Sequence, residues 1–371
     1  MKDVWEEVGR WAVQGDRVAI AMVVGAKRSA PRPLGTKMAI NDRGEIAGGV
    51  SGGCVEGAVV EIAERVIDSG QPELAHFGIA DSEAWGVGLP CGGEIDVWVQ
   101  AYEPGPFERA ARAGDRAAEV IRLEGPRAGA KLFVTPNGGH IGSLGSVPAD
   151  ADAVVAARAA LWTDTPARRG AVFIDVVAPP ARLVLVGAVD IAGALCTLAR
   201  AIGWRSFVID PRARFARPER FSDAEDVLTV WPEQGFVQLG GIDPATAVVA
   251  LTHDPKLDDA ALITALRSPA MFVGAMGSRQ AQAKRLERLR DAGLESEHLE
   301  RLSAPVGLDL GASAPGETAL SILAEVIAVR HGRDGGRLRT VSGRIHDTRV
   351  NQLDREREPA GLSHDVLSAN A

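Results

Sequence analysis

The chain has 371 residues, of which 46% are hydrophobic and 24% are charged, and its formal net charge is −8. This length exceeds what one ordinary hydrophobic core holds, so we expect two or three globular domains. The acidic balance argues against a nucleic-acid-binding surface, because such surfaces are basic. The longest early apolar run, VAIAMVVGA, is far too short to span a membrane. Three cysteines and an N-terminus without the apolar region of a signal peptide predict a cytoplasmic protein.

Hydrophobic periodicity predicts the elements of the first half of the chain. In order, they are a helix at 3–14, a buried strand at 18–26, a loop at 27–40, a turn at 41–44, a helix after Cys54 that ends at Gly70, a strand at 95–99, a mixed stretch at 107–124, a hairpin at 131–145, a helix at about 150–162 and a strand at 171–177. This mixture predicts an N-terminal mixed α/β domain over 1–178, and Pro179-Pro180 marks the boundary.

Beyond the two prolines, short apolar runs alternate with helical patterns. Strands are expected at 183–187, 206–210, 227–231, 247–252 and 271–276, and helices at 191–203, 257–267, 279–293 and 316–330. This alternation predicts a Rossmann-like domain over 181–330, with a doubly wound parallel sheet. The segment 331–371 is rich in Arg, Gly and Asp without periodicity and is predicted to be a flexible tail.

The motif GGVSGGCVEG at 48–57 places Cys54 directly after Gly52 and Gly53. Paired glycines permit a tight turn, and the apolar pattern that follows is helical. Cys54 is therefore expected next to a helix N-terminus, where backbone N–H groups and the helix dipole favour the thiolate.

The motif GVGLPCGGEID at 86–96 places Cys91 directly before Gly92 and a second glycine, and a strand pattern with period two follows. One thiol is thus predicted to open a helix and the other to open a strand. A free cysteine is more often a buried core residue than a functional one, and this interpretation stays open for both. Cys196, inside the apolar run AGALCTLARAIG, is expected in the core.

The loop KRSAPRPLGTKMAI at 27–40 carries Arg28, Arg32 and Lys37, and two prolines and a glycine bracket Arg32 and hold the segment extended. Solvated side chains are the ordinary interpretation. Three cations just before the Cys54 turn also permit an anion-binding role.

The strand–turn–helix at 183–203 is where a dinucleotide fingerprint is expected. Gly187 supplies the first glycine, and Asp210 lies 23 residues further on, near the spacing of a ribose-binding acid. Val189, however, stands where a second glycine lets the backbone approach a pyrophosphate. Asp190 adds a carboxylate where phosphates meet the helix. The pattern predicts the fold and argues against NAD(P) binding.

Three loops at the carboxyl ends of the other strands carry polar residues: THDPK at 252–256, GSR at 277–279 and GLDLGA at 307–312. Ligands of open α/β sheets bind at this edge. Each residue also has an ordinary explanation, such as a helix cap for Ser278. Together they predict a ligand site.

Seven stretches, in this order and spread over about residues 10–345, resemble the xanthine dehydrogenase accessory family, also called the XdhC/CoxI family. They are APRPLGTKMAI, GGVSGGCVEG, AWGVGLPCGGEIDV, FARPERF, ALTHDPKLDD, FVGAMGSRQAQAKRLERL and APVGLDLGA. The resemblance implies a protein that binds molybdenum cofactor and delivers it, often sulfurated, to a xanthine dehydrogenase or CO-dehydrogenase-type molybdenum hydroxylase. It implies a maturation factor more than a catalyst. It also implies a homodimer and contacts with the client enzyme and a cysteine desulfurase.

The resemblance also assigns residues: Cys54 and Cys91 are the matching thiols, and Arg279 and Asp309 match in the Rossmann-like half. Many family members carry GAGHVA where this chain has GAVDIA, which argues against a nucleotide-linked step. Since the cofactor is an anionic pterin phosphate with soft sulfur ligands on its metal, we expect it between the two domains, with Cys54 at the molybdenum and Cys91 in support. The residues expected to bind it are Arg32, Gly52, Gly53, Gly92, His253, Asp254, Ser278, Arg279 and Asp309.

Three alternatives belong to other classes. An NAD(P)-dependent oxidoreductase would use the Rossmann turn. A cysteine hydrolase would need His76 or His253 beside Cys54. A zinc site would combine Cys54, Cys91 and His253, although no CxxC pair is present.

Overall fold

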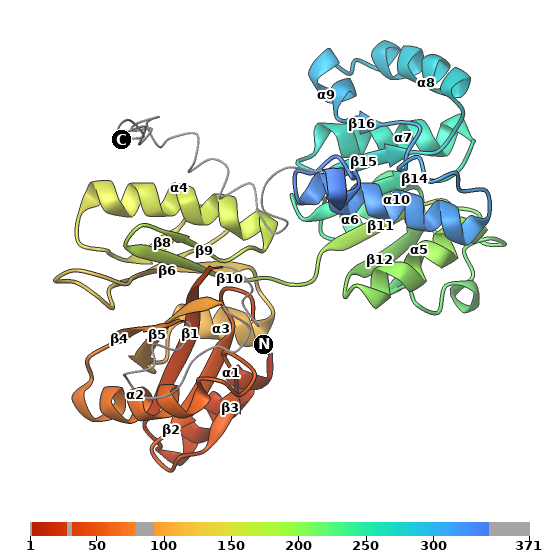
Figure 1. Ribbon diagram of the computed structural model, residues 1–371. Helices are drawn as coiled ribbons and strands as arrows, with labels where there is room; N and C mark the ends of the chain where they lie inside the picture. The colour runs from red at the N-terminus through yellow and green to blue at the C-terminus, as the bar shows by residue number, and fades with distance from the viewer. Residues whose placement is uncertain (1, 28–31, 79–92, 341–371) are drawn as a thin grey trace, which may run out of the picture. The chain divides into compact units, whose positions relative to one another are not determined.

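The computed structural model describes residues 2–27, 32–78 and 93–340 of the chain (Figure 1). The chain forms two compact units, and the division falls between Pro179 and Pro180. Unit 1 ends at the first proline and unit 2 begins at the second. Cys91, Gly92 and Arg28 lie outside the described residues, as does most of the predicted tail.

The described residues of unit 1 form two antiparallel five-stranded sheets. Sheet A has the order β3-β2-β1-β5-β4, with bounds Ile46–Gly48, Lys37–Asn41, Val18–Lys27, Glu94–Ala101 and Glu73–Phe77. Sheet B has the order β8-β7-β6-β10-β9, with bounds His140–Gly142, Lys131–Val134, Ala117–Arg122, Val172–Val177 and Ala167–Arg169. The predicted hairpin is confirmed as β7 and β8.

Each sheet of unit 1 has one face covered by a helix. Helix α2, Glu56–Ser69, packs its buried residues Val59, Ile62 and Val66 on sheet A, together with alternate residues of β1 and β5. Helix α4, Val147–Thr163, covers sheet B in the same way. The other faces of the sheets share a core that contains the buried side chains of Trp98 and Phe173. Truncating such an aromatic side chain to alanine costs about 3–5 kcal/mol.

Helix α1, Lys2–Gln14, and helix α3, Pro106–Ala113, fill a further core of unit 1. Their side chains meet residues of β1, β2, β6 and β10, and the ring of Trp5 makes an edge contact with Phe107 at 6.5 Å. The stretch at 107–124, which the sequence left unresolved, is thus α3 followed by β6.

Unit 2 is a doubly wound α/β domain with six parallel strands in the order β13-β12-β11-β14-β15-β16. Their bounds are Asp226–Leu228, Arg205–Ile209, Arg182–Val186, Thr246–Ala250, Phe272–Ala275 and Leu302–Ser303. The reversal of order between β11 and β14 is that of a dinucleotide-binding sheet. This confirms the fold class predicted from the sequence.

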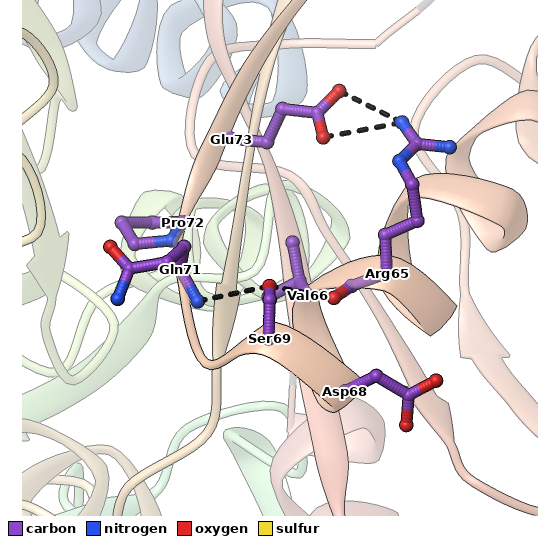
Figure 2. A pocket seen from close by; sticks show the side chains of 7 residues that line it. All are labelled: Arg65, Val66, Asp68, Ser69, Gln71, Pro72 and Glu73. Carbon is purple, nitrogen blue, oxygen red and sulfur yellow. Dashed lines mark hydrogen bonds and ion pairs between the residues drawn. The ribbon is translucent and has the colours of Figure 1, made fainter.

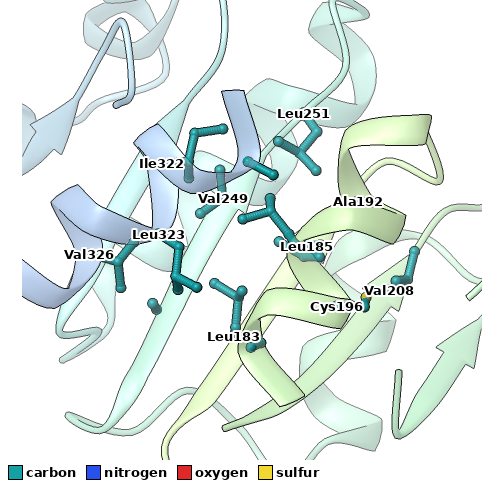
Figure 3. Close-up of a cluster of buried hydrophobic side chains, with 14 of the residues drawn as sticks. Leu183, Leu185, Ala192, Cys196, Val208, Val249, Leu251, Ile322, Leu323 and Val326 are labelled. Carbon is teal, nitrogen blue, oxygen red and sulfur yellow. The ribbon is translucent and has the colours of Figure 1, made fainter. Parts of the chain in front are cut away.

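The helices of unit 2 cover both faces of this sheet. On one face, α5 (Asp190–Ala201) and α10 (Pro315–Arg330) meet the strands in a core that contains Leu185, Cys196 and Ile322 (Figure 3). On the other face lie α6 (Pro232–Gln238), α7 (Pro255–Arg267), α8 (Arg279–Asp291) and α9 (Ser296–Glu300). Short 3-10 helices occur at Pro218–Arg220 and Leu338–Thr340. Cys196 is buried, and burial raises the pKa of its thiol, as expected of a core cysteine.

One local prediction is wrong. The expected loop at 27–40 ends earlier, because Lys37–Asn41 forms the fully buried strand β2. Lys37 is not a solvated cation: its Nζ lies 2.6 Å from Asp175 Oδ2 and donates to the carbonyl oxygen of Gly35. Lys37 is therefore unable to bind an external anion.

Candidate functional site

The loop that carries Cys54 is folded around the side chain of Glu56, the first residue of α2. The two carboxylate oxygens accept six hydrogen bonds at 2.5 to 3.2 Å. The donors are the backbone N–H groups of Val50, Ser51, Gly52, Gly53 and Val55 and the hydroxyl group of Ser51. Backbone N–H groups that converge in this way form an anion-binding nest. Here the anion is part of the chain itself.

This setting keeps Glu56 ionised. Burial by itself would raise its pKa, but the hydrogen bonds from Ser51 and Gly52 outweigh burial and lower the pKa to about 2. Glu56 does not stand out in the sequence, because a Glu in the first turn of a helix is common on dipole grounds alone. The signal in the sequence was the run of glycines immediately before it.

Cys54 itself lies two residues before α2 and is half-buried. Its backbone N–H donates to Ser51 Oγ at 3.0 Å. Its side chain packs against the core between α2 and sheet A, which includes Val55 and Val59. The predicted position of the thiol beside a helix N-terminus is therefore confirmed.

Among the described residues of unit 1 that were predicted to bind the cofactor, Arg32 is the exposed cation. It is followed by a turn that leads into β2. Gly52 and Gly53 lie in the Cys54 loop with φ of +89° and +116°. These values belong to the left-handed region, which glycine adopts without strain.

His76 and Cys54 lie on opposite sides of sheet A, because Cys54 packs on the side that α2 covers. Along β4, Ala75 and Phe77 contribute to the core beneath α2, so His76 between them points to the opposite face. There its Nδ1 lies 2.7 Å from Asp96 Oδ1, and Asp96 also accepts from Arg168 Nη1 at 2.6 Å. A Cys54–His76 catalytic pair is therefore excluded by geometry.

A second candidate site is a cavity of about 610 Å³ at the carboxyl ends of the strands of unit 2. Apolar side chains such as Ile191 and Met276 contribute to its lining, along with Arg212, His253 and Asp254. Ligand sites of open α/β sheets occur in this position and in this size range. Two of the residues predicted to bind a ligand, His253 and Asp254, therefore line a cavity.

The other residues predicted at this edge do not line the cavity. Ser278 is the N-cap of α8 and accepts from the N–H group of Ala281 at 3.2 Å, and Arg279 begins that helix with an exposed side chain. Asp309 is also exposed. Asp254, which lines the cavity, is also the N-cap residue of α7 and accepts a hydrogen bond from the N–H group of Lys256.

The carboxylate of Asp210, which was expected to bind a ribose, already accepts hydrogen bonds from the chain itself. Asp210 is fully buried, and its carboxylate accepts from Ala188 N and from three nitrogens of Arg212, at 2.6 to 2.9 Å. Burial by itself would raise the pKa of Asp210, but these hydrogen bonds lower it below its usual value. Four donors fill a carboxylate, so no acceptor site remains for a ribose hydroxyl.

The turn before α5 is equally unsuited to a pyrophosphate. Asp190 occupies the first turn of α5, where its exposed carboxylate lies 2.9 Å from Arg220 Nη2. Gly187 has φ of +115°, and a Cβ there would lie 2.4 Å from the methyl group of Thr252. This glycine accommodates Thr252 rather than a phosphate group.

Next to the cavity lies a buried polar cluster that was not predicted from the sequence. Asp258 Oδ1 accepts from Thr252 Oγ1 at 2.5 Å, and Asp258 Oδ2 accepts from Arg285 Nη2 at 3.1 Å. Arg285 also donates to Gln282 and to the carbonyl oxygen of Met276. Burial raises the pKa of Asp258 to about 6, although Thr252 and Arg285 oppose this effect. The cluster ties two cavity-lining loops to α7 and α8.

A shallow hollow of about 600 Å³ lies at the end of α2 (Figure 2). It is lined by Arg65, Asp68 and Glu73 among others, and Arg65 Nη2 lies 2.9 Å from Glu73 Oε1. Because these opposite charges are paired with each other, the hollow offers no convergent group for a ligand.

Among the residues that the structure describes, no three His, Cys, Asp or Glu side chains are grouped so as to hold a metal ion. The zinc alternative depends partly on Cys91, which lies outside those residues. In the same ranges, no helix has both the length and the apolar character needed to cross a membrane.

Two family models match the chain. The XdhC and CoxI family model matches residues 11–78, and the XdhC Rossmann domain model matches residues 183–326. Together they cover more than half of the sequence. The chain belongs to the XdhC and CoxI family.

Individual relatives agree with this assignment. The chain is 28% identical to a protein of Bacillus subtilis (strain 168) that is described as a probable subunit of xanthine dehydrogenase, over 85% of this chain and 94% of that protein. It is also 28% identical to the molybdenum cofactor insertion chaperone PaoD of Escherichia coli (strain K12), over 86% of this chain and 87% of PaoD. A crystal structure of a protein from Bacillus halodurans, described as a xanthine dehydrogenase, is similar with a TM-score of 0.59 and 23% identity. It covers 91% of this chain and 97% of its own, and shows that the fold is shared.

Proposed function

We propose that this XdhC-family protein is a molybdenum cofactor insertion chaperone for a molybdenum hydroxylase. The observation that carries the proposal is the match to PaoD along nearly the whole of both chains. The two family models and the Bacillus subtilis relative support the same class of client. In this proposal the molybdenum cofactor is cargo, which the protein receives and hands over.

The contact to the cargo in unit 1 is assigned to Cys54. Its thiol is half-buried on a loop with a defined shape, and thiolates are preferred ligands of soft metal centres. Arg32 is exposed in the same unit and is suited to the anionic phosphate of the pterin. Cys91 is assigned a supporting role on the sequence motif alone.

The cavity of unit 2 is assigned to the organic part of the cargo. Its apolar side chains accommodate a flat heterocycle, and His253 and Asp254 supply polar groups at its wall. Arg279 and Asp309 are exposed and follow neighbouring strands in the sequence, so they remain part of the proposal as outer contacts. Ser278 is included among the proposed contacts of the cargo because it directly precedes Arg279.

Several finer points belong to the proposal as well. The cargo is delivered in its sulfurated form, a cysteine desulfurase supplies the sulfur, and the working form of the protein is a homodimer in the cytoplasm. The client is a xanthine dehydrogenase or a CO-dehydrogenase-type hydroxylase. These points are supported by family membership.

The test is to measure molybdenum and pterin per chain after anaerobic purification from a molybdate-replete host that expresses the client. Wild type, Cys54→Ala and Cys196→Ala are compared, since Cys196 is a core thiol and serves as the matched control. We expect cargo in wild type and Cys196→Ala and its loss in Cys54→Ala. Equal cargo in all three would overturn the assignment of Cys54, and absence of cargo from wild type would overturn the chaperone proposal.

A further inference from the structure

We propose that Glu56 is a positioning residue for Cys54, and that its carboxylate is the internal anion that gives the 50–55 loop its shape. The inference rests on the proposed function in one respect only: it takes Cys54 to be the thiol that meets the cargo. The positioning itself is a property of the chain and is measurable without cargo.

The contacts of Glu56 reach the whole loop rather than a single helix cap. Val55 is the N-cap residue of α2 and makes no side-chain cap, whereas Glu56 turns back along the chain. Its oxygens accept hydrogen bonds from the N–H groups of five of the six residues from 50 to 55. An ionised carboxylate suits this place because it accepts hydrogen bonds and donates none.

Packing does not explain the conformation of the two glycines in the loop. A Cβ at Gly52 or Gly53 would meet no atom within 4 Å, and both residues are exposed. Each nevertheless has a positive φ and points its N–H group at Glu56, at 2.9 and 2.8 Å. Because no crowding at the Cβ position requires glycine here, we attribute the turn to the hydrogen bonds that the two N–H groups donate to the carboxylate.

Ser51 connects Glu56 to the cysteine. Its hydroxyl group donates to Glu56 Oε2 at 2.5 Å, and its oxygen accepts from Cys54 N at 3.0 Å and from Val55 N at 3.1 Å. A hydroxyl group has a single hydrogen, so the carboxylate fixes which way it points and leaves the lone pairs for the two N–H groups. The backbone of Cys54 is thereby held through Ser51 by the charge of Glu56.

This arrangement limits what the loop is able to do with a cargo. The N–H groups that would otherwise bind a phosphate are already used by Glu56. The loop therefore presents the cargo with sulfur and not with an anion site, and the phosphate of the pterin has to be bound elsewhere.

The experiment compares wild type with Glu56→Gln, Ser51→Ala and the matched control Glu64→Gln. Glu64 is an exposed residue of the same helix, so its substitution changes the charge of α2 without touching the loop. In Glu56→Gln, one carboxylate oxygen becomes an amide nitrogen, which would face the N–H donors of the loop and repel them. Alkylation by iodoacetamide is followed by mass spectrometry at Cys54. Protection of the buried Cys196 and the tryptophan emission, to which the buried Trp11 and Trp98 contribute, report on folding.

We expect Cys54 alkylation to rise about tenfold in Glu56→Gln, because the half-buried thiol is released, and by less in Ser51→Ala, which retains the carboxylate. Cys196 protection and tryptophan emission stay unchanged, and Glu64→Gln behaves as wild type. An alkylation rate in Glu56→Gln equal to that of wild type overturns the positioning role. Should Glu56→Gln fail to fold, an unchanged rate in folded Ser51→Ala overturns it instead.

Cargo measurements separate this inference from the proposed function. If Cys54→Ala loses molybdenum while Glu56→Gln retains the wild-type content and alkylation rate, Cys54 holds the cargo and the positioning role is wrong. If Glu56→Gln changes alkylation while Cys54→Ala retains all its molybdenum, Glu56 positions the thiol but the proposed role of Cys54 fails. Loss of cargo in both variants, with faster alkylation in Glu56→Gln, supports both.

Discussion

The guanidinium group of Arg285 lies 3.1 Å from the carboxylate of Asp258 in the interior of unit 2, where both side chains are at most 5% exposed. The two residues come from different helices, α8 and α7, and Thr252 from the loop after β14 completes the cluster. The floor of the cavity therefore depends on a buried ion pair whose acid has a pKa of about 6.

The first prediction is that Asp258 makes unit 2 less stable as the pH rises from about 4 to about 6. An unfolded Asp titrates near 3.8, whereas the folded one titrates near 6, so in this window the folded state binds the extra proton. The free energy of unfolding then falls with pH by at most about 1.4 kcal/mol per unit. Urea unfolding at several pH values, in wild type and Asp258→Asn, isolates this slope as a difference. Identical slopes in the two proteins would contradict the prediction.

The second prediction concerns the buried pair of Lys37 and Asp175 in unit 1, whose side chains are 3% and 2% exposed. Replacing one partner leaves the other charge buried and unpaired, so Lys37→Met is expected to lose about 3–5 kcal/mol of unfolding free energy. Burial raises the pKa of Asp175, although Lys37 opposes this. The double variant Lys37→Met/Asp175→Leu, measured by urea unfolding, is expected to recover most of the loss. A double variant as unstable as the single one would count against this account.

Much of the fold was predictable because its signals are local. Gly70 ends α2 with φ of +68°, Ser278 caps α8, and alternating strands and helices indicated the parallel sheet. Each of these depends on a few consecutive residues and on one periodicity.

The site was less predictable because its main contacts join residues that are far apart in the sequence, or involve a side chain that folds back over the preceding loop. Lys37 resembles a loop cation until Asp175, far along the chain, is placed beside it. Asp258 resembles a solvated acid near a helix start, and its partner Arg285 lies 27 residues later. Glu56 resembles an ordinary first-turn acid, because helical periodicity says nothing about a side chain that folds back over the preceding loop.

The third prediction is that NADH does not bind unit 2. The carboxylate of Asp210 is filled by Ala188 and Arg212, and Asp190 places negative charge at the start of α5. Energy transfer from the tryptophans, of which Trp204 and Trp231 lie in unit 2, is expected to show no saturable signal up to about 1 mM NADH. Saturable binding at micromolar NADH would favour the oxidoreductase alternative.

The fourth prediction is that Gly187 and Thr252 are energetically coupled. A Cβ at Gly187 would lie 2.4 Å from the Thr252 methyl group, and φ of +115° is itself unfavourable for alanine. Gly187→Ala is therefore expected to lose more than about 2 kcal/mol of unfolding free energy, on the scale of an overpacked core. Thr252→Ser removes the methyl group but retains the hydroxyl group that donates to Asp258. In a double-mutant cycle measured by urea unfolding, it should recover the steric part of the loss and leave the backbone part. Additive effects of the two substitutions would mean that the glycine is required for its φ alone.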